Sequence, residues 1–260
     1  MRYFILMIAF LLVNCNSSSQ KKDVKSKIDN KSKTTYRADK IIFPSLDSLP
    51  ITANFYQVKS TKPMILLCHQ AGFSRGEYKA TAIKLNNLGY TCLAIDQRSG
   101  NIANDVINET ALAAKKRNLP QSYFDAKQDI QAAINFLYKK NNNQPIILVG
   151  SSYSATLALL VGVNSSKVKA IAAFSPGEYY NTIDVKNSIK NMAKPIFVTS
   201  SKKESESVTE LVALINPDYV TQFIPNVEGI HGSKALWKST RGSENYWKAF
   251  VSFLQKNSEL

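Results

Sequence analysis

The sequence predicts an α/β domain with a doubly wound, mostly parallel sheet that begins with an antiparallel hairpin. Five continuous apolar runs have the length of parallel strands buried on both faces, at residues 64–68, 90–95, 146–149, 168–174 and 196–198. Segments with helical periodicity lie between these runs, and two short strand-like segments precede them. This alternation places a ligand site at the carboxyl ends of the strands.

The hairpin is expected at residues 40–43 and 51–56. These segments flank the turn-forming sequence Ser45-Leu46-Asp47-Ser48. Pro50 stands at the start of the second strand, where a proline is tolerated. The hairpin therefore precedes the first parallel strand.

Three helices have boundaries that the sequence indicates. Ser74 and Glu77 have the spacing of a capping box, and apolar residues then follow on one helical face until Gly89 ends the helix. Residues 130–138 show the spacing of an amphipathic helix that packs on a sheet. Residues 155–163 are apolar all round, so we expect this helix in the interior, directly after the third apolar run.

The start of the chain has the features of a lipoprotein-type signal peptide over residues 1–15. Its apolar run of ten residues, 4–13, is about half as long as a bilayer-spanning helix. The segment Leu12-Val13-Asn14-Cys15 resembles the lipobox of bacterial lipoproteins. That resemblance implies acylation of Cys15 and a lipid anchor in a bacterial cell envelope, on the periplasmic or surface side of the membrane.

The residues around Cys15 decide between two cleavage sites, and those after it predict a tether. Asn14 departs from the small residue that usually precedes the acylated Cys, so ordinary cleavage near residues 17–19 stays open as the alternative. Residues 16–40 are polar and almost free of large apolar side chains, which predicts a flexible tether. Residues 41–260 then form the single folded domain.

Charge and composition exclude several classes of function. The formal net charge is +14, but nine basic and only three acidic residues fall within residues 1–40, and the remaining lysines are scattered. We therefore expect no nucleic-acid partner. The glycines form neither type of nucleotide-phosphate loop, and three Cys and two His are too few for a zinc finger or a histidine-triad metal site. We expect no cofactor and no metal.

The third apolar run leads into Gly150-Ser151-Ser152-Tyr153-Ser154 and then into the interior helix. A nucleophilic serine is commonly held at such a strand-turn-helix bend, where the residues two before and two after it must be small. Gly150 and Ser154 satisfy this steric rule, although the usual pattern ends in Gly. Ser152 is therefore the candidate nucleophile.

A serine hydroxyl needs a base, and histidine is the side chain suited to that role near neutral pH. His231 follows the last apolar run in a glycine-flanked loop. A carboxylate is expected between nucleophile and base, to orient the imidazole. Glu204 comes just after the run at 196–198 and is our candidate acid, with Glu206 as a near competitor.

Two backbone N–H groups complete the expected site as an oxyanion hole. One belongs to Tyr153, the residue after the nucleophile, and the other to Ala71, in the loop after the first apolar run. With Ser152, Glu204 and His231 in this chain order, residues 41–260 resemble the α/β-hydrolase superfamily, in its dienelactone-hydrolase-like or small-esterase branch.

The resemblance implies an α/β-hydrolase-like fold without a large lid domain, since only twenty residues, 175–194, lie between the run at 168–174 and the strand segment that starts at Pro195. It implies a serine hydrolase that cleaves a small carboxylic ester, or a thioester or peptide bond, through an acyl-enzyme. Residues 100–122 are the other possible wall of the site. The alternative is a non-catalytic envelope lipoprotein that uses the fold as a binding or scaffold module.

Several residues depart from the family pattern or have other expected roles. Gln70 stands where the family commonly has Gly after His, and dienelactone hydrolases proper use a Cys nucleophile, so their substrate is not carried over. His69 is expected to shape its loop. Asp96 and Asp129 are structural by default. Arg75, Arg98 and Arg241 are candidates to pair with a substrate carboxylate, but we favour ordinary cations at the surface or behind the site. Cys68 and Cys92 are either buried thiols or a disulfide.

Overall fold

The computed structural model describes Met1 and residues 38–258. The expected signal peptide after Met1, Cys15 as acylation site and residues 16–37 of the expected tether lie outside the described residues.

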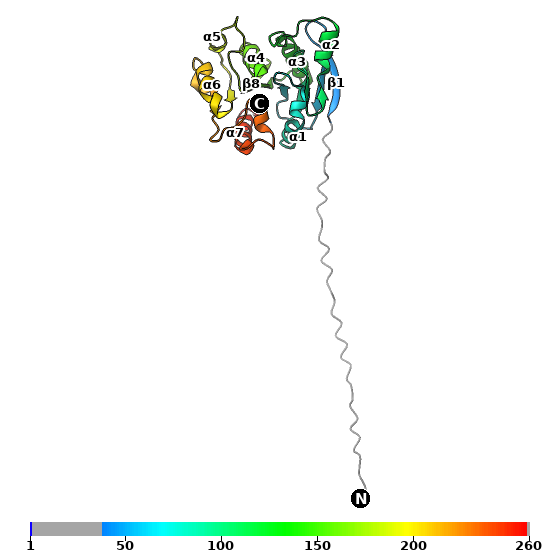
Figure 1. Cartoon of the computed structure of the whole chain (residues 1–260), viewed down its shortest axis with the longest axis vertical. Coiled ribbons are helices and arrows are strands. Elements are labelled where there is room, and N and C mark those ends of the chain that lie inside the picture. Colours follow the sequence, from blue (N-terminus) through cyan, green and yellow to red (C-terminus); the bar gives the residue numbers. More distant parts are fainter. Residues whose placement is uncertain (2–37, 259–260) are drawn as a thin grey trace. The chain divides into compact units, whose positions relative to one another are not determined.

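An eight-stranded mixed sheet organises the domain (Figure 1). Its spatial order is β1-β2-β4-β3-β7-β8-β9-β10, with β1 antiparallel to β2, β2 antiparallel to β4, and all other neighbours parallel. The sheet therefore confirms the predicted doubly wound, mostly parallel architecture with an antiparallel start. The strands are β1 (Asp39–Pro44), β2 (Pro50–Tyr56), β3 (Ile65–Cys68), β4 (Cys92–Ile95), β7 (Ile146–Ser151), β8 (Val168–Phe174), β9 (Ile196–Thr199) and β10 (Val220–Phe223).

Helices cover both faces of this sheet (Figure 1). One face packs against α1 (Lys79–Asn87) and α7 (Ser243–Lys256). The opposite face packs against α3 (Lys127–Lys140), α4 (Tyr153–Gly162), α5 (Val185–Ile189) and α6 (Ser205–Val212). Helix α2 (Glu109–Lys116) contacts β2 near the antiparallel edge.

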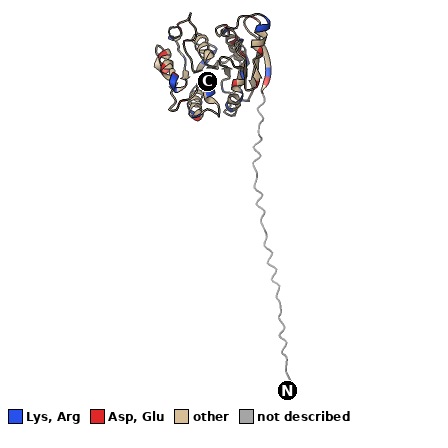
Figure 2. Ribbon diagram, viewed as in Figure 1, with Lys and Arg blue, Asp and Glu red and all other residues tan. Residues whose placement is uncertain are grey.

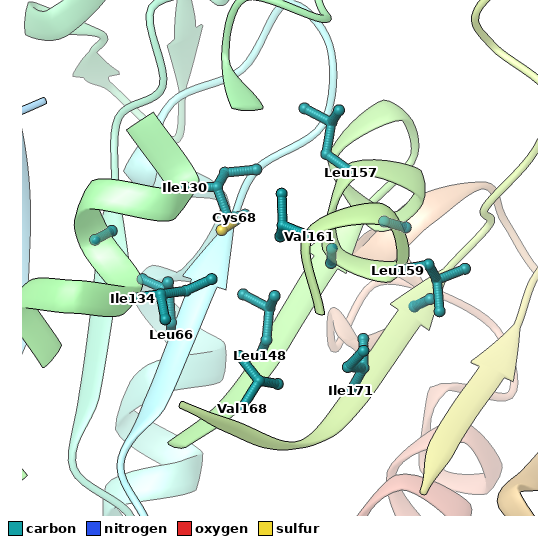
Figure 3. Close-up of a cluster of buried hydrophobic side chains, with 14 of the residues drawn as sticks. Leu66, Cys68, Ile130, Ile134, Leu148, Leu157, Leu159, Val161, Val168 and Ile171 are labelled. Atoms are coloured by element: carbon teal, nitrogen blue, oxygen red, sulfur yellow. The ribbon is translucent and has the colours of Figure 1, made fainter. Parts of the chain in front are cut away.

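The continuous apolar runs reflect this double coverage, since successive strand residues point to opposite faces. Along β3, Leu66 and Cys68 belong to the cluster under α3 and α4, whereas Ile65 and Leu67 belong to the cluster under α1 and α7. Figure 3 shows the first cluster, where Leu66 lies beside Ile134 of α3 and Leu148 of β7. Each large apolar side chain buried in this way contributes about 1.5–3 kcal/mol.

Cys68 and Cys92 are free, buried thiols within the described chain. They lie on adjacent strands, but Cys68 pairs with Ile95 and Cys92 with Ile65 in the β3–β4 register. Their side chains also belong to clusters on opposite faces of the sheet. The disulfide alternative is therefore wrong, and the buried-thiol alternative is correct.

The predicted capping box at Ser74 is also wrong. Ser74 does cap, because its Oγ accepts the Gly76 N–H at 3.1 Å. However, residues 75–78 form a 3-10 turn, η1 (Arg75–Tyr78), before α1 begins, and Glu77 turns into the protein to accept the Gln70 N–H at 2.7 Å. The local spacing is the same in both arrangements, so only long-range contacts decide between them.

Some elements of the structure have no counterpart among the sequence expectations. These are β10, α7, α2, α6 and a two-stranded ribbon made of β5 (Ile102–Ala103) and β6 (Val106–Ile107). The ribbon and α2 occupy the interval 100–122, and α5 is the short helix that fills the interval 175–194. No lid domain lies between β8 and β9.

Charged residues are distributed over several separate elements of the described part (Figure 2). Among the described residues, no helix has both the length and the apolar character needed to cross a membrane.

Candidate active site

Ser152 lies at the bend between β7 and α4. Its backbone has φ +59° and ψ −126°, a positive-φ conformation that is costly for a residue with a side chain. The Ser152 N–H is bonded to the Phe174 carbonyl at 2.8 Å, which ties the bend to β8. A Cβ on Gly150 would come within 2.4 Å of the Ser154 carbonyl, so this position requires Gly.

Ser154 occupies the position where the usual pattern has Gly. Its Oγ donates a hydrogen bond to the Cys68 carbonyl at 2.8 Å and accepts the Ser151 N–H at 2.9 Å. The hydroxyl therefore links the bend to the neighbouring strand β3, a contact that Gly cannot provide. This departure from the family pattern keeps the residue small and adds a hydrogen bond between the bend and β3.

The structure brings Ser152, His231 and Glu204 into one row of hydrogen bonds. His231 Nε2 lies 2.8 Å from Ser152 Oγ, and His231 Nδ1 lies 2.5 Å from Glu204 Oε1. Ser152 is at the end of β7, Glu204 is in the 3-10 turn η2 (Lys202–Glu204) after β9, and His231 precedes η4 (Gly232–Leu236). All three therefore lie beyond the carboxyl ends of parallel strands, as the fold class predicts.

Glu204 is held as a carboxylate. Partial burial on its own would raise the pKa of Glu204, but hydrogen bonds from His231 and Ser201, together with the charge of His231, outweigh burial and lower the pKa to about 2. Its Oε2 accepts the Ser201 O–H at 2.8 Å and the Ser175 O–H at 3.0 Å. Oε1 is thereby left for His231. Glu206, the alternative candidate acid, is exposed on α6 and makes no bond to His231 among the described residues.

Ser175 is a residue of the site that sequence reasoning missed. It follows β8 with φ +54°, and its Oγ accepts the Gly232 N–H at 2.9 Å while donating to Glu204. One hydroxyl thus ties the carboxylate to the loop of His231. A Ser after a strand is a common sequence feature, so no local pattern identifies this role.

Tyr153 and Ala71, the expected oxyanion donors, follow β7 and β3 in the chain. Tyr153 is the first residue of α4, where a helix leaves its N–H without an intrahelical acceptor. Ala71 follows β3, and its N–H forms no hydrogen bond within the described part of the chain. The side chain of Tyr153 points elsewhere: its hydroxyl bonds to the Ser99 carbonyl at 3.2 Å and its ring stacks on Tyr123.

His69 shapes the loop that carries Ala71. It is fully buried, with Nδ1 2.8 Å from the Gln70 carbonyl and Nε2 3.1 Å from the Gln97 N–H. A carbonyl accepts and an amide donates, so these partners select the neutral tautomer with the proton on Nδ1. His69 makes no hydrogen bond to Ser152 among the described residues.

Because His69 is buried and neutral, we expect the protein to lose stability on mild acidification. Burial lowers the pKa of His69 from 6.5 to about 4, against the opposing bond to Gln70. The unfolded chain therefore binds the proton first, and stability present above pH 6.5 is lost as the pH falls toward 4, by about 3 kcal/mol. Urea unfolding at pH 7.0 and 4.5 measures this loss, which should be smaller in His69→Gln. An equally steep loss in that variant would contradict the assignment.

Two of the three arginines considered as substrate ligands are engaged with the protein. Arg75 is buried and pairs with Asp96 and Glu109. Arg98 is fully buried and pairs with Asp129 and, at 2.8 Å, with Asp47. The structural interpretation of these arginines and of both aspartates is therefore correct. Arg241 is exposed.

Tyr179 and a cavity border the row of three residues on one side. The Tyr179 hydroxyl donates to the Ser175 carbonyl at 2.8 Å, and burial raises the pKa of Tyr179. A cavity of about 410 Å³ opens beside it, lined also by Gly177, Lys203 and Glu204. Other cavities are larger, and one of them shares Gly177 with this cavity, so volume alone does not locate the site. No group of three or more His, Cys, Asp or Glu side chains suited to a metal ion occurs within the described residues.

Comparisons with known proteins identify the fold and the family of the chain. The family model described as serine aminopeptidase, S33, matches residues 59–222. Curated proteins gave no significant match to the sequence. Among solved structures, the chain is similar to an esterase of Pyrococcus furiosus, with TM-score 0.68, 16% identity and coverage of 86% of this chain and 92% of that chain.

Two further solved structures share the fold. A dienelactone hydrolase of Anabaena variabilis has TM-score 0.65 and 13% identity, with 86% of this chain and 100% of that chain covered. The acylaminoacyl peptidase of Pyrococcus horikoshii has TM-score 0.63 and 16% identity, with 85% of this chain but 41% of that chain covered. The family match and the strand order together show that the chain belongs to the serine aminopeptidase S33 family of the α/β-hydrolase superfamily.

Proposed function

We propose that this protein is a serine hydrolase that cleaves small carboxylic esters through an acyl-enzyme on Ser152. The observation that carries the proposal is the row of hydrogen bonds from Ser152 Oγ to His231 Nε2, at 2.8 Å, and from His231 Nδ1 to Glu204, at 2.5 Å. Such a row matches what the Ser-His-acid mechanism requires.

In this mechanism His231 takes the Ser152 proton as Oγ attacks the ester carbonyl carbon. The carbon–oxygen double bond opens to an oxyanion, which then collapses and expels the alcohol, with His231 returning the proton to the leaving oxygen. Water then attacks the acyl-enzyme by the same route and releases the acid. Glu204 stays ionised throughout, since its pKa is about 2, and it stabilises the imidazolium.

The backbone N–H groups of Ala71 and Tyr153 are the donors that would stabilise the oxyanion. A donor aimed at developing charge stabilises the transition state more than the ground state, and each one is worth about 2.7–4 kcal/mol. The cavity beside Tyr179 and Glu204 is the nearest space for part of the substrate. No lid domain covers the site within the described residues, which favours small or extended esters.

We further propose that the enzyme acts in a bacterial cell envelope, anchored to a membrane through acylated Cys15. This rests on the sequence of residues 1–15 and on the polar stretch 16–40, which would serve as a tether of about 25–30 Å. Metabolic labelling with a clickable fatty acid tests it. Label retained in wild type and lost in Cys15→Ala is the expected result, and unlabelled wild-type protein is the contrary one.

Steady-state hydrolysis of p-nitrophenyl esters of graded acyl length tests the proposed reaction. An aminoacyl arylamide is included because the family description names an aminopeptidase. We expect saturable ester hydrolysis, with shorter acyl groups preferred and the arylamide cleaved more slowly. Preference for the arylamide would favour peptide-bond cleavage. No turnover of any substrate by folded protein would favour the non-catalytic binding module.

A further inference from the structure

A buried carboxylate that none of these steps uses lies close to the candidate site. Glu77 belongs to η1, and only 1% of the residue is exposed. Its Oε2 accepts the Gln70 N–H at 2.7 Å, and its Oε1 accepts the Ser233 O–H at 2.5 Å. The Glu77 side chain thus joins two loops that are far apart in the sequence.

Each partner of Glu77 is adjacent to a proposed functional group. Gln70 immediately precedes Ala71, whose N–H is the proposed second oxyanion donor. Ser233 is two residues after His231, and its own N–H bonds to Ser151 Oγ at 2.8 Å, next to the nucleophile. Glu77 therefore connects the proposed oxyanion loop, the loop of the base and the bend of the nucleophile.

The two loops are also packed directly together at Gly232. This glycine has φ +72°, and a Cβ on it would come within 2.6 Å of Gln70 Oε1 and 2.7 Å of Ser151 Oγ. Gly232 therefore lies in close contact with the Gln70 side chain and with the bend of the nucleophile, without space for an unshifted methyl group. The hydrogen bonds of Glu77 join the loop of Gln70 to the loop of Ser233 and fix how these two loops lie against each other.

Keeping a carboxylate in this place is costly for the fold. Burial raises the pKa of Glu77, although the bonds from Ser233 and Gln70 oppose this rise. Within the described residues no Lys or Arg nitrogen forms an ion pair with Glu77, and Lys234 acts on it only at longer range. A buried carboxylate without a neighbouring cation depends on hydrogen-bond donors for its stabilisation. For Glu77 these donors are the Gln70 N–H and the Ser233 O–H.

We propose that Glu77 is a positioning residue: it holds the His231 loop and the Ala71 loop in the mutual alignment that the reaction needs. This inference rests on the proposed function. Glu77 does not touch the reacting atoms and acts through Ser233 and Gln70.

The test measures kcat, KM, melting temperature and the rate of fluorophosphonate labelling for three variants. Ser233→Ala removes one of the two bonds, and we expect kcat to fall by about tenfold or more with KM within about twofold. Glu77→Leu removes both bonds, and we expect a fall of about a hundredfold. Glu77→Gln keeps the shape: its amide oxygen accepts the Gln70 N–H while its NH₂ donates to Ser233 Oγ, so kcat should stay within about threefold of wild type.

Ser45→Ala is the matched control, because it removes another buried bond from a hydroxyl to a carboxylate, that of Ser45 to Asp129 at 2.6 Å in the β1–β2 turn, together with the bond that Ser45 Oγ accepts from Arg98. We expect any change in its melting temperature to come without a fall in kcat. If kcat and the labelling rate in Ser233→Ala equal those of wild type, the inference is overturned. The inference is also overturned if kcat falls equally in Ser45→Ala and Ser233→Ala, because the loss of kcat then follows the loss of stability alone.

Failure of the inference is distinguishable from failure of the proposed function. Wild-type protein that is folded but neither hydrolyses esters nor reacts with a fluorophosphonate overturns both. Wild-type protein that reacts, beside a Ser233→Ala variant that reacts at the same rate, overturns only the role of Glu77. Loss of kcat in Glu77→Leu that Glu77→Gln restores supports it.

Discussion

Replacing Ser152 with Ala is expected to lower kcat/KM for an ester by about 10⁴-fold or more. The variant lacks the oxygen that forms the acyl-enzyme, whereas the contacts that bind the substrate remain, so KM should change little. His231→Ala should be affected to a similar degree, because the serine hydroxyl then has no base. Initial-rate kinetics on the most reactive ester of the graded panel measure both effects.

The double variant gives the sharper result. Groups that act as one unit are strongly non-additive, so Ser152→Ala/His231→Ala should be about as slow as either single variant. Additive losses would mean that the two side chains act independently, which contradicts a shared proton transfer. Melting temperatures close to that of wild type would show that each variant is folded.

The second large effect is expected for Glu204→Gln, a loss of about 10³–10⁴-fold in kcat. The bonds from Ser201 and Ser175 keep an oxygen at the Oε2 position, so the new NH₂ group would face His231 Nδ1. That nitrogen must then accept, which moves the imidazole proton to Nε2, facing Ser152. The histidine would be in the wrong tautomer to act as a base.

Glu206→Gln is the matched control for this prediction. Glu206 is exposed in the first turn of α6, two residues after Glu204, and we expect kcat within about twofold of wild type. A large loss in Glu206→Gln together with near-normal activity in Glu204→Gln would show that Glu206 is the acid instead. Comparable, small losses in both would mean that His231 needs no carboxylate.

The sequence predicts the parts of this site whose constraints are local. Gly150 and Ser154 are small because a tight bend surrounds Ser152, and such steric limits are visible in five consecutive residues. Residue type, chain order and a place just after a strand select His231 and Glu204, because the connections of a doubly wound sheet return each loop to the same edge. The structure brings these side chains together at hydrogen-bond distance.

Contacts between residues far apart in the sequence leave no such local pattern. Ser175 contacts Gly232 across 57 residues, and Ser233 contacts Glu77 across 156. The sequence even predicts a capping box at Glu77, because a Ser followed by Glu three positions later has the same spacing whether or not the carboxylate turns inward. Helix α7 does show a readable pattern, in the spacing of Tyr246, Phe250 and Phe253, whereas β10 is short and partly exposed and shows almost none.

The most direct test of the central claim is the site at which a fluorophosphonate modifies the folded, full-length protein. We predict one covalent adduct, located by peptide mass spectrometry at Ser152, absent from Ser152→Ala and formed far more slowly in His231→Ala. Folded protein that stays unmodified, or an adduct that maps to another residue and persists in Ser152→Ala, would contradict a nucleophilic role for Ser152.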